Sequence, residues 1–378
     1  MTSPLNLPSP RLRFIDMARS IAILLMLEGH FVDLTLAQQW RLPGNPIYDT
    51  WLYIRGMTAP MFFTVTGLVF AYLLSGAKEP GFWKIPRVRK GIIRAAELLI
   101  WGYLLQLNLR LLPALLRGEK DPWLEAFHVL QCIGVGLLGM ILLFALARRT
   151  RGLPLAAIYA SAAIAIYLLK IWLDHQPTHI PQNAPTWLQN TLKGPRSPFP
   201  IAPWLGYTFY GAALGVTVRA LRPHLSKPTA PLAIITLGIA LRFGGWWIDQ
   251  QLAHTLLTLT QTPPLIIHDF FHGRIGEMLI VLGTLVWIEN HYQPRDSWFL
   301  TIGQNTFPIY VAHVILLYGG IFGIGLRPIL ENRLNPWQAS LGALLFVALF
   351  AALAQTITPL QNLWKTRKTP THPQQQKP

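Results

Sequence analysis

Long apolar runs separated by short polar segments recur along most of the chain. A helix needs about 20 mostly apolar residues to cross the hydrocarbon core of a bilayer, and ten segments approach that length. They are 14–36, 58–76, 91–112, 129–148, 154–173, 203–221, 231–248, 274–289, 299–320 and 337–358. Charged residues interrupt the seventh and eighth segments, at Arg242 and Glu277. The pattern predicts an all-α, polytopic integral membrane protein with about ten transmembrane helices.

Basic residues gather in alternate loops between these segments. The clusters are Lys84, Arg87, Arg89 and Lys90 after the second segment, Arg148, Arg149 and Arg151 after the fourth, and Arg219, Arg222 and Lys227 after the sixth. Basic residues also precede the first segment and follow the tenth, whereas the other loops have mixed charge. Short loops rich in Lys and Arg stay on the cytoplasmic side. Both termini are therefore predicted to be cytoplasmic.

A single transmembrane domain is predicted over residues 1–360, followed by a disordered, basic and polar cytoplasmic tail over 361–378. Hydrophobic residues make up 52% of the chain and charged residues 13%, against about 25% charged in soluble domains. The net charge of +16 raises the question of nucleic acid, but its position in short loops is explained by topology. We expect a multi-pass protein of the cell (inner or plasma) membrane, with the lipid bilayer and no nucleic acid as a partner.

The first apolar segment contains the stretch RSIAILLMLEGHF, in which Arg19 and His30 are eleven positions apart. On a helix this spacing corresponds to about three turns, so both side chains share one face, about 16 Å apart along the axis. Asp16 precedes Arg19 by three residues and Asp33 follows His30 by three. This spacing allows an ion pair with Arg19 and a contact that orients the His30 ring.

Two interpretations of this face are compatible with the spacing. An ionisable side chain within the bilayer costs about 2.5–3.5 kcal/mol and normally faces a bundle interior or a watery cavity. There, a neutral His30 could take a proton from a nucleophile or accept an acyl group. Alternatively, Arg19 extends its charged end to the inner surface and His30 is an interfacial polar residue.

Other charged residues favour structural roles. Glu28 lies about 200° around the helix from His30, so we expect an ion pair with a cation on another span. The candidates are Arg94, Arg242 and Arg274. In HDFFHGRIGE (268–277), His268 and His272 have the spacing of metal ligands, but the glutamate of a zinc-protease motif is missing between them. A salt-bridged helix start is favoured, and the single Cys132 excludes a cysteine-based zinc site. No metal is predicted.

The arrangement of Arg19, ten intervening residues and His30 resembles the transmembrane acyltransferase superfamily. That superfamily includes bacterial O-acetylases of surface polysaccharides and the heparan-α-glucosaminide N-acetyltransferases. Four later stretches resemble it in order: TAPMFFTVTGL (58–68), FHVLQCIGVGLL (127–138), FPIAPWLGYTFYGAALG (199–215) and LTIGQNTFPIYVAHVILLYG (300–319). The Leu-Gln-x-Ile-Gly and Pro-Trp-Leu-Gly motifs favour the heparan acetyltransferase-like branch, of bacterial type. Arg19-Ser20 stands where Arg-Gly is common, and Glu28 before the histidine is unusual, which leaves substrate choice open.

The resemblance implies an acyltransferase that uses acyl-CoA, usually acetyl-CoA, from the cytoplasmic side. The acceptor would be a sugar hydroxyl or amino group of a glycan or glycoside at the outer side. His30 would be the general base or acyl carrier, with Arg19 and Asp33 beside it as catalytic residues. Arg19 would also hold a phosphate or the pantetheine amides at the inner mouth of this face.

Further residues are candidates for binding the coenzyme. Lys84, Arg87 and Arg89 could hold its phosphates, although positive-inside topology alone also explains this loop. Gln131, Asn305 and His313 could form the second wall of an acyl-CoA tunnel, or simply hydrogen-bond between helices. Asn305, Ile309 and His313 follow one another at four-residue steps, so Asn305 and His313 are predicted to share a helix face.

Two other functions remain open. A transporter of a charged small molecule or lipid could use the same intramembrane ionisable residues, although no inverted repeat is visible in the sequence. A structural or regulatory subunit is the other. The sequence leaves undecided the acceptor, the acyl chain length, whether acyl-histidine forms, and whether the protein is a homodimer.

Overall fold

The computed structural model describes residues 12–77, 79–119, 121, 123–150, 153–175, 180, 183–194, 197–261, 270–292 and 297–368. Within these ranges the regular structure is helical, apart from an isolated bridge between Leu36 and Leu334. The all-α prediction is confirmed. The helices are α1 (Arg13–Thr35), α2 (Pro46–Arg55), α3 (Thr58–Leu74), α4 (Pro86–Gln106), α5 (Leu112–Leu116), α6 (Val129–Arg149), α7 (Leu155–His175), α8 (Thr186–Leu192), α9 (Ile201–Ala220), α10 (Thr229–Leu259), α11 (Phe271–Tyr292), α12 (Trp298–Gln304), α13 (Thr306–Tyr318), α14 (Arg327–Leu330) and α15 (Pro336–Lys368).

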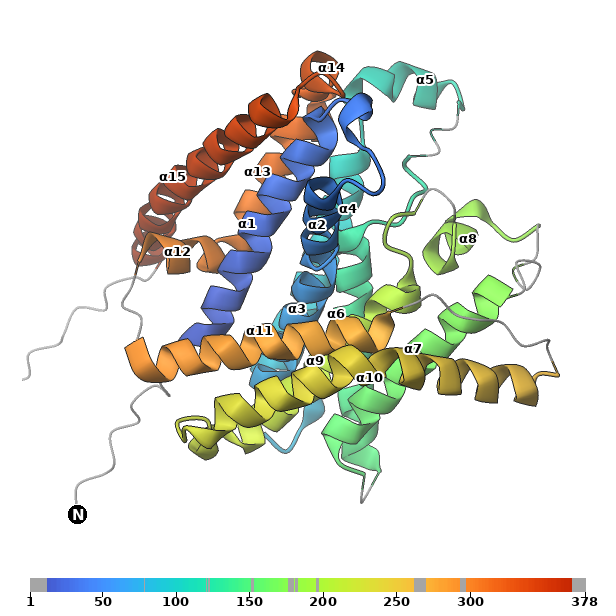
Figure 1. The fold of residues 1–378 in the computed structure, drawn as a ribbon, viewed down its shortest axis with the longest axis vertical. Helices are drawn as coiled ribbons and strands as arrows, with labels where there is room; N and C mark the ends of the chain where they lie inside the picture. The colour runs from blue at the N-terminus through green and yellow to red at the C-terminus, as the bar shows by residue number, and fades with distance from the viewer. Residues whose placement is uncertain are drawn as a thin grey trace, which may run out of the picture.

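Each of the ten predicted segments contains a helix. Among the described residues, six helices are long and apolar enough to cross a membrane, or eight when two bent helix pairs are each counted as one span. The pair Pro46–Leu74, formed by α2 and α3, counts as one of the six. The protein is a multi-pass membrane protein, and the count of ten spans and the cytoplasmic termini stay predictions. In Figure 1, α5 and α14 lie at the upper side of the bundle, and α1 and α15 run downward from there on its left side.

Two helix groups surround the centre of the molecule. Helices α1, α12, α13 and α15 pack together on one side of the view in Figure 1, and α7, α9, α10 and α11 cross the lower part. Between them, α3 packs along α9 and α4 packs along α6. The bundle therefore brings the first helix and the ninth predicted segment together, although about 280 residues separate Ser20 from Phe299 in sequence.

The contact between α3 and α9 brings the two backbones together. A Cβ added at Gly67 would collide with the backbone carbonyl of Thr208, and one added at Gly211 would collide with that of Thr64. Gly215, one turn further along α9, meets the Leu68 carbonyl in the same way. Small residues four positions apart are typical of close helix crossings in membranes. These glycines are required because no side chain fits between the helices.

The ninth predicted segment is not one straight helix. It bends by 83° between α12 and α13, at Asn305. Ser20 on α1 holds α12 in place just before the bend, because its hydroxyl donates to the Phe299 carbonyl (2.5 Å) and accepts from the Gly303 N–H (3.0 Å). Consequently the N-terminus of α13 begins inside the bundle, beside α1.

Candidate functional site: a basic cavity next to a buried histidine pair

A cavity of about 570 Å³ lies between α1, α3, α4, α6, α12 and α13. Its walls are largely apolar, with Phe62, Phe70 and Leu137 among them. Its cations are Arg19, Arg87, Lys90 and Arg94. Thr306 and Phe307 also line it, so the positive end of the α13 dipole and the first N–H groups of that helix add to the cationic field. The cavity offers apolar walls and anion-binding groups together.

Helical phase decides which basic residues of the predicted loop face this cavity. The structure begins α4 at Pro86, so Arg87, Lys90 and Arg94 follow one another at three- and four-residue steps and share a face. Arg89 points elsewhere and Lys84 precedes the helix; neither lines the cavity. The structure therefore brings Arg87, but not Lys84 or Arg89, together with Arg19.

The two other cavity cations have defined partners. Arg19 forms the predicted ion pair with Asp16, at 3.9 Å. Arg94 pairs with Glu97 at 2.9 Å, and its guanidinium lies 4.1 Å from the centre of the Phe307 ring. Both arginine side chains line the cavity and are about one-third exposed, at 33% and 39%. Their position suits an anionic ligand with a planar ring.

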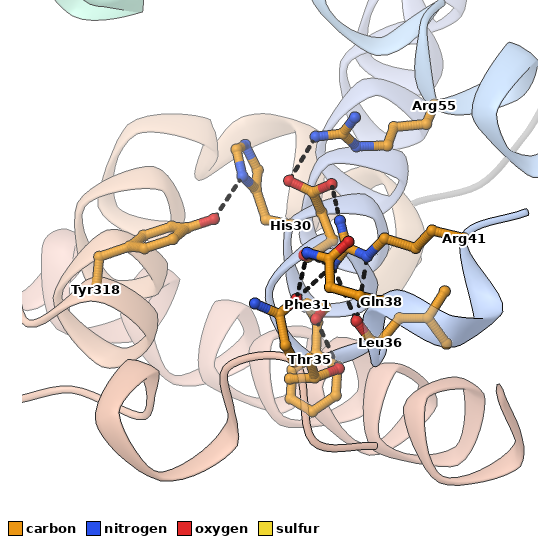
Figure 2. A network of polar contacts seen from close by, with 10 residues as sticks. His30, Phe31, Thr35, Leu36, Gln38, Arg41, Arg55 and Tyr318 are labelled. Carbon is orange, nitrogen blue, oxygen red and sulfur yellow. Dashed lines mark hydrogen bonds and ion pairs between the residues drawn. The ribbon is translucent and has the colours of Figure 1, made fainter. Parts of the chain in front are cut away.

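Beyond the wall of the cavity, two rings lead to His30. Tyr310 lines the cavity, and its ring centre is 5.0 Å from that of His313. The His313 ring is 5.3 Å from that of His30. His30 is partly buried, and its Nδ1 is 3.0 Å from the Tyr318 hydroxyl, as Figure 2 shows. The cavity and His30 are thus neighbours through two side chains of α13.

Asp33 does not orient His30. Its carboxylate pairs with Arg55 at 2.7 Å and with Arg41 at 3.6 Å, and Figure 2 shows the hydrogen bond of His30 going to Tyr318 instead. The reason is that Arg55 lies across α1 at Gly29, where the missing side chain leaves room for it. Asp33 therefore fixes α2, and the loop that joins α1 to α2, to the end of α1.

Glu28 forms no ion pair with the expected arginines, so that prediction is wrong. Its carboxylate accepts a hydrogen bond from the Trp51 indole at 2.8 Å. Arg242 and Arg274 instead hold the buried Glu277, at 3.0 and 2.8 Å, and Arg94 holds Glu97. Trp51 on α2 takes the place of the expected cation. The sequence pattern did not predict α2, so this partner could not be foreseen.

Gln131 and Asn305 are buried but do not line the cavity. Gln131 donates to the side chain of Gln106 on α4, which matches the alternative of a hydrogen bond between helices. Asn305 stands at the bend and donates to the Thr301 carbonyl at 2.9 Å. Because the segment is bent there, the argument that Asn305 and His313 share one continuous helical face is wrong.

A hydrogen-bonded chain of two buried residues and the partly buried Tyr210 was not foreseen. His272 Nδ1 is 2.5 Å from the carboxylate of Asp249 on α10, and its Nε2 is 2.7 Å from the Tyr210 hydroxyl on α9. His268 lies outside the described residues, and among those described no group of three or more potential ligands could hold a metal ion. The favoured salt-bridged helix start would have Asp269 near its N-terminus, but this residue also lies outside the described residues. Within them, Arg274 and Glu277 form an ion pair near the start of α11.

Replacing Asp249 by asparagine is expected to lower the free energy of unfolding by about 1–3 kcal/mol. The carboxylate accepts both the ring and the backbone N–H of His272. The asparagine amide can accept only one of them and turns a donor toward the other. Thermal unfolding in detergent measures the loss. Glu119→Gln is the control, because its pair with Arg117 is exposed, and it should change stability by less than about 1 kcal/mol. Equal midpoints for the two variants would contradict the prediction.

The most important residues that the sequence interpretation missed are Tyr310 and Tyr318. Tyr310 stands three residues before His313 and could have been placed on its face from helical spacing. Tyr318 stands five residues after it, off that face, and it reaches His30 only because α13 continues to the left-handed cap at Gly319. Its role follows from the packing of α13 against α1 and has no local signal.

Comparison with protein families gives one match. The model of the family described as heparan-alpha-glucosaminide N-acetyltransferase, catalytic, matches residues 11–243, more than half of the chain. The matched region contains Arg19, His30 and the basic face of α4, and ends before α13. A search of the curated proteins finds no match.

Proposed function

Because the chain belongs to the heparan-α-glucosaminide N-acetyltransferase catalytic family, a family of membrane acyltransferases, we propose that it transfers an acetyl group from cytoplasmic acetyl-CoA to an acceptor at the outer side of the cell membrane. The acceptor is a sugar hydroxyl or amino group of a glycan or glycoside. The coenzyme occupies the basic cavity, and His30 is the general base or the acyl carrier. Arg19 binds the coenzyme at the inner end of the same helix face.

One observation carries this proposal: the basic cavity ends at Tyr310, two ring contacts from His30. Coenzyme A combines phosphates with a long, thin pantetheine arm, and the cavity combines cations near the start of α4 with apolar walls farther in. The negative groups would lie near Arg87, Lys90 and Arg94, and the thioester near Tyr310. An acyl group could then cross the membrane region while the nucleotide stays at the inner side.

The chemistry of His30 depends on its tautomer. When Nδ1–H donates to the Tyr318 oxygen, the lone pair of Nε2 is available. That nitrogen can take the proton of an acceptor hydroxyl in direct transfer, or attack the thioester carbonyl in a two-step route through acetyl-histidine. Tyr318 serves both routes because it holds the ring and the tautomer in place. Asp33 contributes indirectly, by fixing Arg55 and α2 next to this end of α1.

The experiment for the proposed function is acetyl-CoA turnover by the purified protein in nanodiscs. Free thiol is followed with and without a mixture of glucosamine, its oligomers and neutral sugars, and coenzyme A binding is measured by calorimetry. Thiol release that rises with an acceptor is expected. If the protein binds no coenzyme A and releases no thiol, the result would contradict the proposal and favour the transporter interpretation.

The position of the basic residues supplies a matched comparison. The double variant Arg87→Gln/Lys90→Gln is expected to raise the KM for acetyl-CoA at least about tenfold, because it removes two charge-assisted contacts of roughly 1 kcal/mol each. The variant Lys84→Gln/Arg89→Gln removes the same net charge outside the cavity. It should leave KM nearly unchanged. Equal effects of the two double variants would show that only the overall charge of this loop matters.

A further inference from the structure

Acyl transfer across the membrane region raises a problem of proton balance. The carbon–sulfur bond of the thioester breaks and a carbon–oxygen or carbon–nitrogen bond forms. The acceptor loses a proton, and the departing sulfur must gain one to leave as a thiol. In the proposed function the acceptor comes from the outer side and the sulfur from the cavity, so one base beside the acceptor cannot directly serve both ends.

His313 lies between these two ends. It is fully buried, with a relative exposure of 0%. Its ring is adjacent to His30 on one side and to Tyr310, which lines the cavity, on the other. Among the residues that the structure describes, neither Nδ1 nor Nε2 of His313 forms a hydrogen bond of normal geometry, and the ring's polar backbone neighbours are the groups of Ile309 and Tyr310, one turn back on the same helix. No other ring lies between His30 and the cavity wall in this set of contacts.

Two unpartnered nitrogens on a buried imidazole are costly, because each loses its hydrogen bonds to water without replacement. The neighbouring histidine illustrates the contrast, since Nδ1 of His30 is held by Tyr318. A side chain that only filled space here could be apolar. A histidine that only oriented the His30 ring would form a hydrogen bond to it through one of its nitrogens. A ring that receives a proton on one nitrogen and releases one from the other needs both nitrogens free.

We propose that His313 is a catalytic residue that relays the acceptor proton to the departing sulfur. This inference rests on the proposed function. As the acceptor attacks, its proton moves to Nε2 of His30. The protonated His30 passes a proton to one nitrogen of His313, while the other nitrogen donates its proton to the sulfur as the carbon–sulfur bond breaks.

The protons gained and lost in this step balance without an outside acid or base. The acceptor proton enters the relay, one proton leaves on the coenzyme thiol, and both histidines end neutral. His313 ends in its other tautomer and returns by exchanging protons or turning its ring. The sulfur reaches His313 past the Tyr310 ring, so the thioester carbonyl lies beside the histidine pair. The relay serves direct transfer, because in the two-step route the sulfur leaves before the acceptor releases its proton.

The test compares acetyl-CoA with its selenoester analogue, in which selenium replaces the sulfur. A selenol is a much stronger acid than a thiol, so the selenolate departs without a proton donor. His313→Gln is expected to lower kcat with acetyl-CoA by about 10²–10⁴-fold and to lower kcat with the selenoester far less. His30→Ala should lose activity with both donors, because it removes the acceptor base.

Coenzyme A affinity and the unfolding midpoint are measured for His313→Gln as well, and both should stay close to wild type. Equal losses with the two donors, or full activity with acetyl-CoA, would overturn the relay. If the variant does not fold, comparing the kcat of the wild-type protein with the two donors still tests the relay. A relay makes the sulfur and selenium donors nearly equal in kcat, whereas a large advantage of the selenoester means that sulfur leaves unassisted. A wild-type protein that turns over neither donor rejects the proposed function itself.

Discussion

Replacing His30 by alanine is expected to lower acceptor-dependent acetyl-CoA turnover by about 10²- to 10⁴-fold, the usual contribution of a positioned general base. The expected loss is in kcat, because the cations proposed to bind the coenzyme lie beyond Tyr310, around the cavity. Coenzyme A affinity should stay within about twofold of wild type, well under the 1.4 kcal/mol that a tenfold change represents. Thiol release and calorimetry on the same preparation measure both quantities.

The control for this variant is His291→Ala. His291 is an exposed histidine near the end of α11 whose ring contacts the Trp287 carbonyl, so full activity is expected. Mass spectrometry of wild-type protein incubated with acetyl-CoA alone separates the two routes. An acetyl group on His30 supports the two-step route, and unmodified protein that is still active supports direct transfer. Activity retained in His30→Ala would remove His30 from the site while leaving the enzyme.

The largest expected loss of stability comes from Gly211→Ala. The new methyl group would collide with the backbone carbonyl of Thr64 on α3, and a backbone cannot move aside as a flexible side chain can. We expect the free energy of unfolding to fall by about 3 kcal/mol or more, at the upper end of overpacking effects. Alanine otherwise favours helix over glycine by about 1 kcal/mol, so any loss reflects the helix contact.

Gly244→Ala makes the same chemical change on α10, at a position where an added Cβ meets no atom within 4 Å. Its unfolding midpoint should stay at or above that of wild type. Both variants are compared by thermal unfolding in one detergent, followed by size-exclusion chromatography. A Gly211→Ala protein as stable as Gly244→Ala would mean that α3 and α9 can separate at little cost.

The helices were predictable to the extent that apolar length defines them. The ten segments contain helices because an apolar run of membrane length must satisfy its backbone hydrogen bonds internally. The exceptions have other causes. The position of α12 just before the bend at Asn305 depends on Ser20, a contact between distant parts of the chain. Helix α2 is amphipathic, short and without a buried residue, so the search for long apolar runs did not predict it.

The sequence predicted site residues that lie on one helix, but it predicted contacts between different helices less well. Arg19 and His30 were identified from their spacing within α1, and the ion pair of Arg19 with Asp16 followed from the same helix. The partners of Asp33 and Glu28 are Arg55 and Trp51, both on α2, and only the folded chain brings them close. Arg87 and Lys90 could have been separated from Arg89 by helical phase, but the predicted span began at residue 91, too late to include them.

The glycine contact of α3 and α9 also limits how this protein can move. Helices whose backbones touch at Gly67, Gly211 and Gly215 cannot slide or rotate past each other without steric collision. Transporters that alternate between two open states generally rock one half of the molecule against the other, and such a motion could not pass through this seam. A stationary frame instead suits a protein in which a small group travels through fixed side chains. Helices α3 and α9 therefore move as one unit, and any larger rearrangement must occur between other helices.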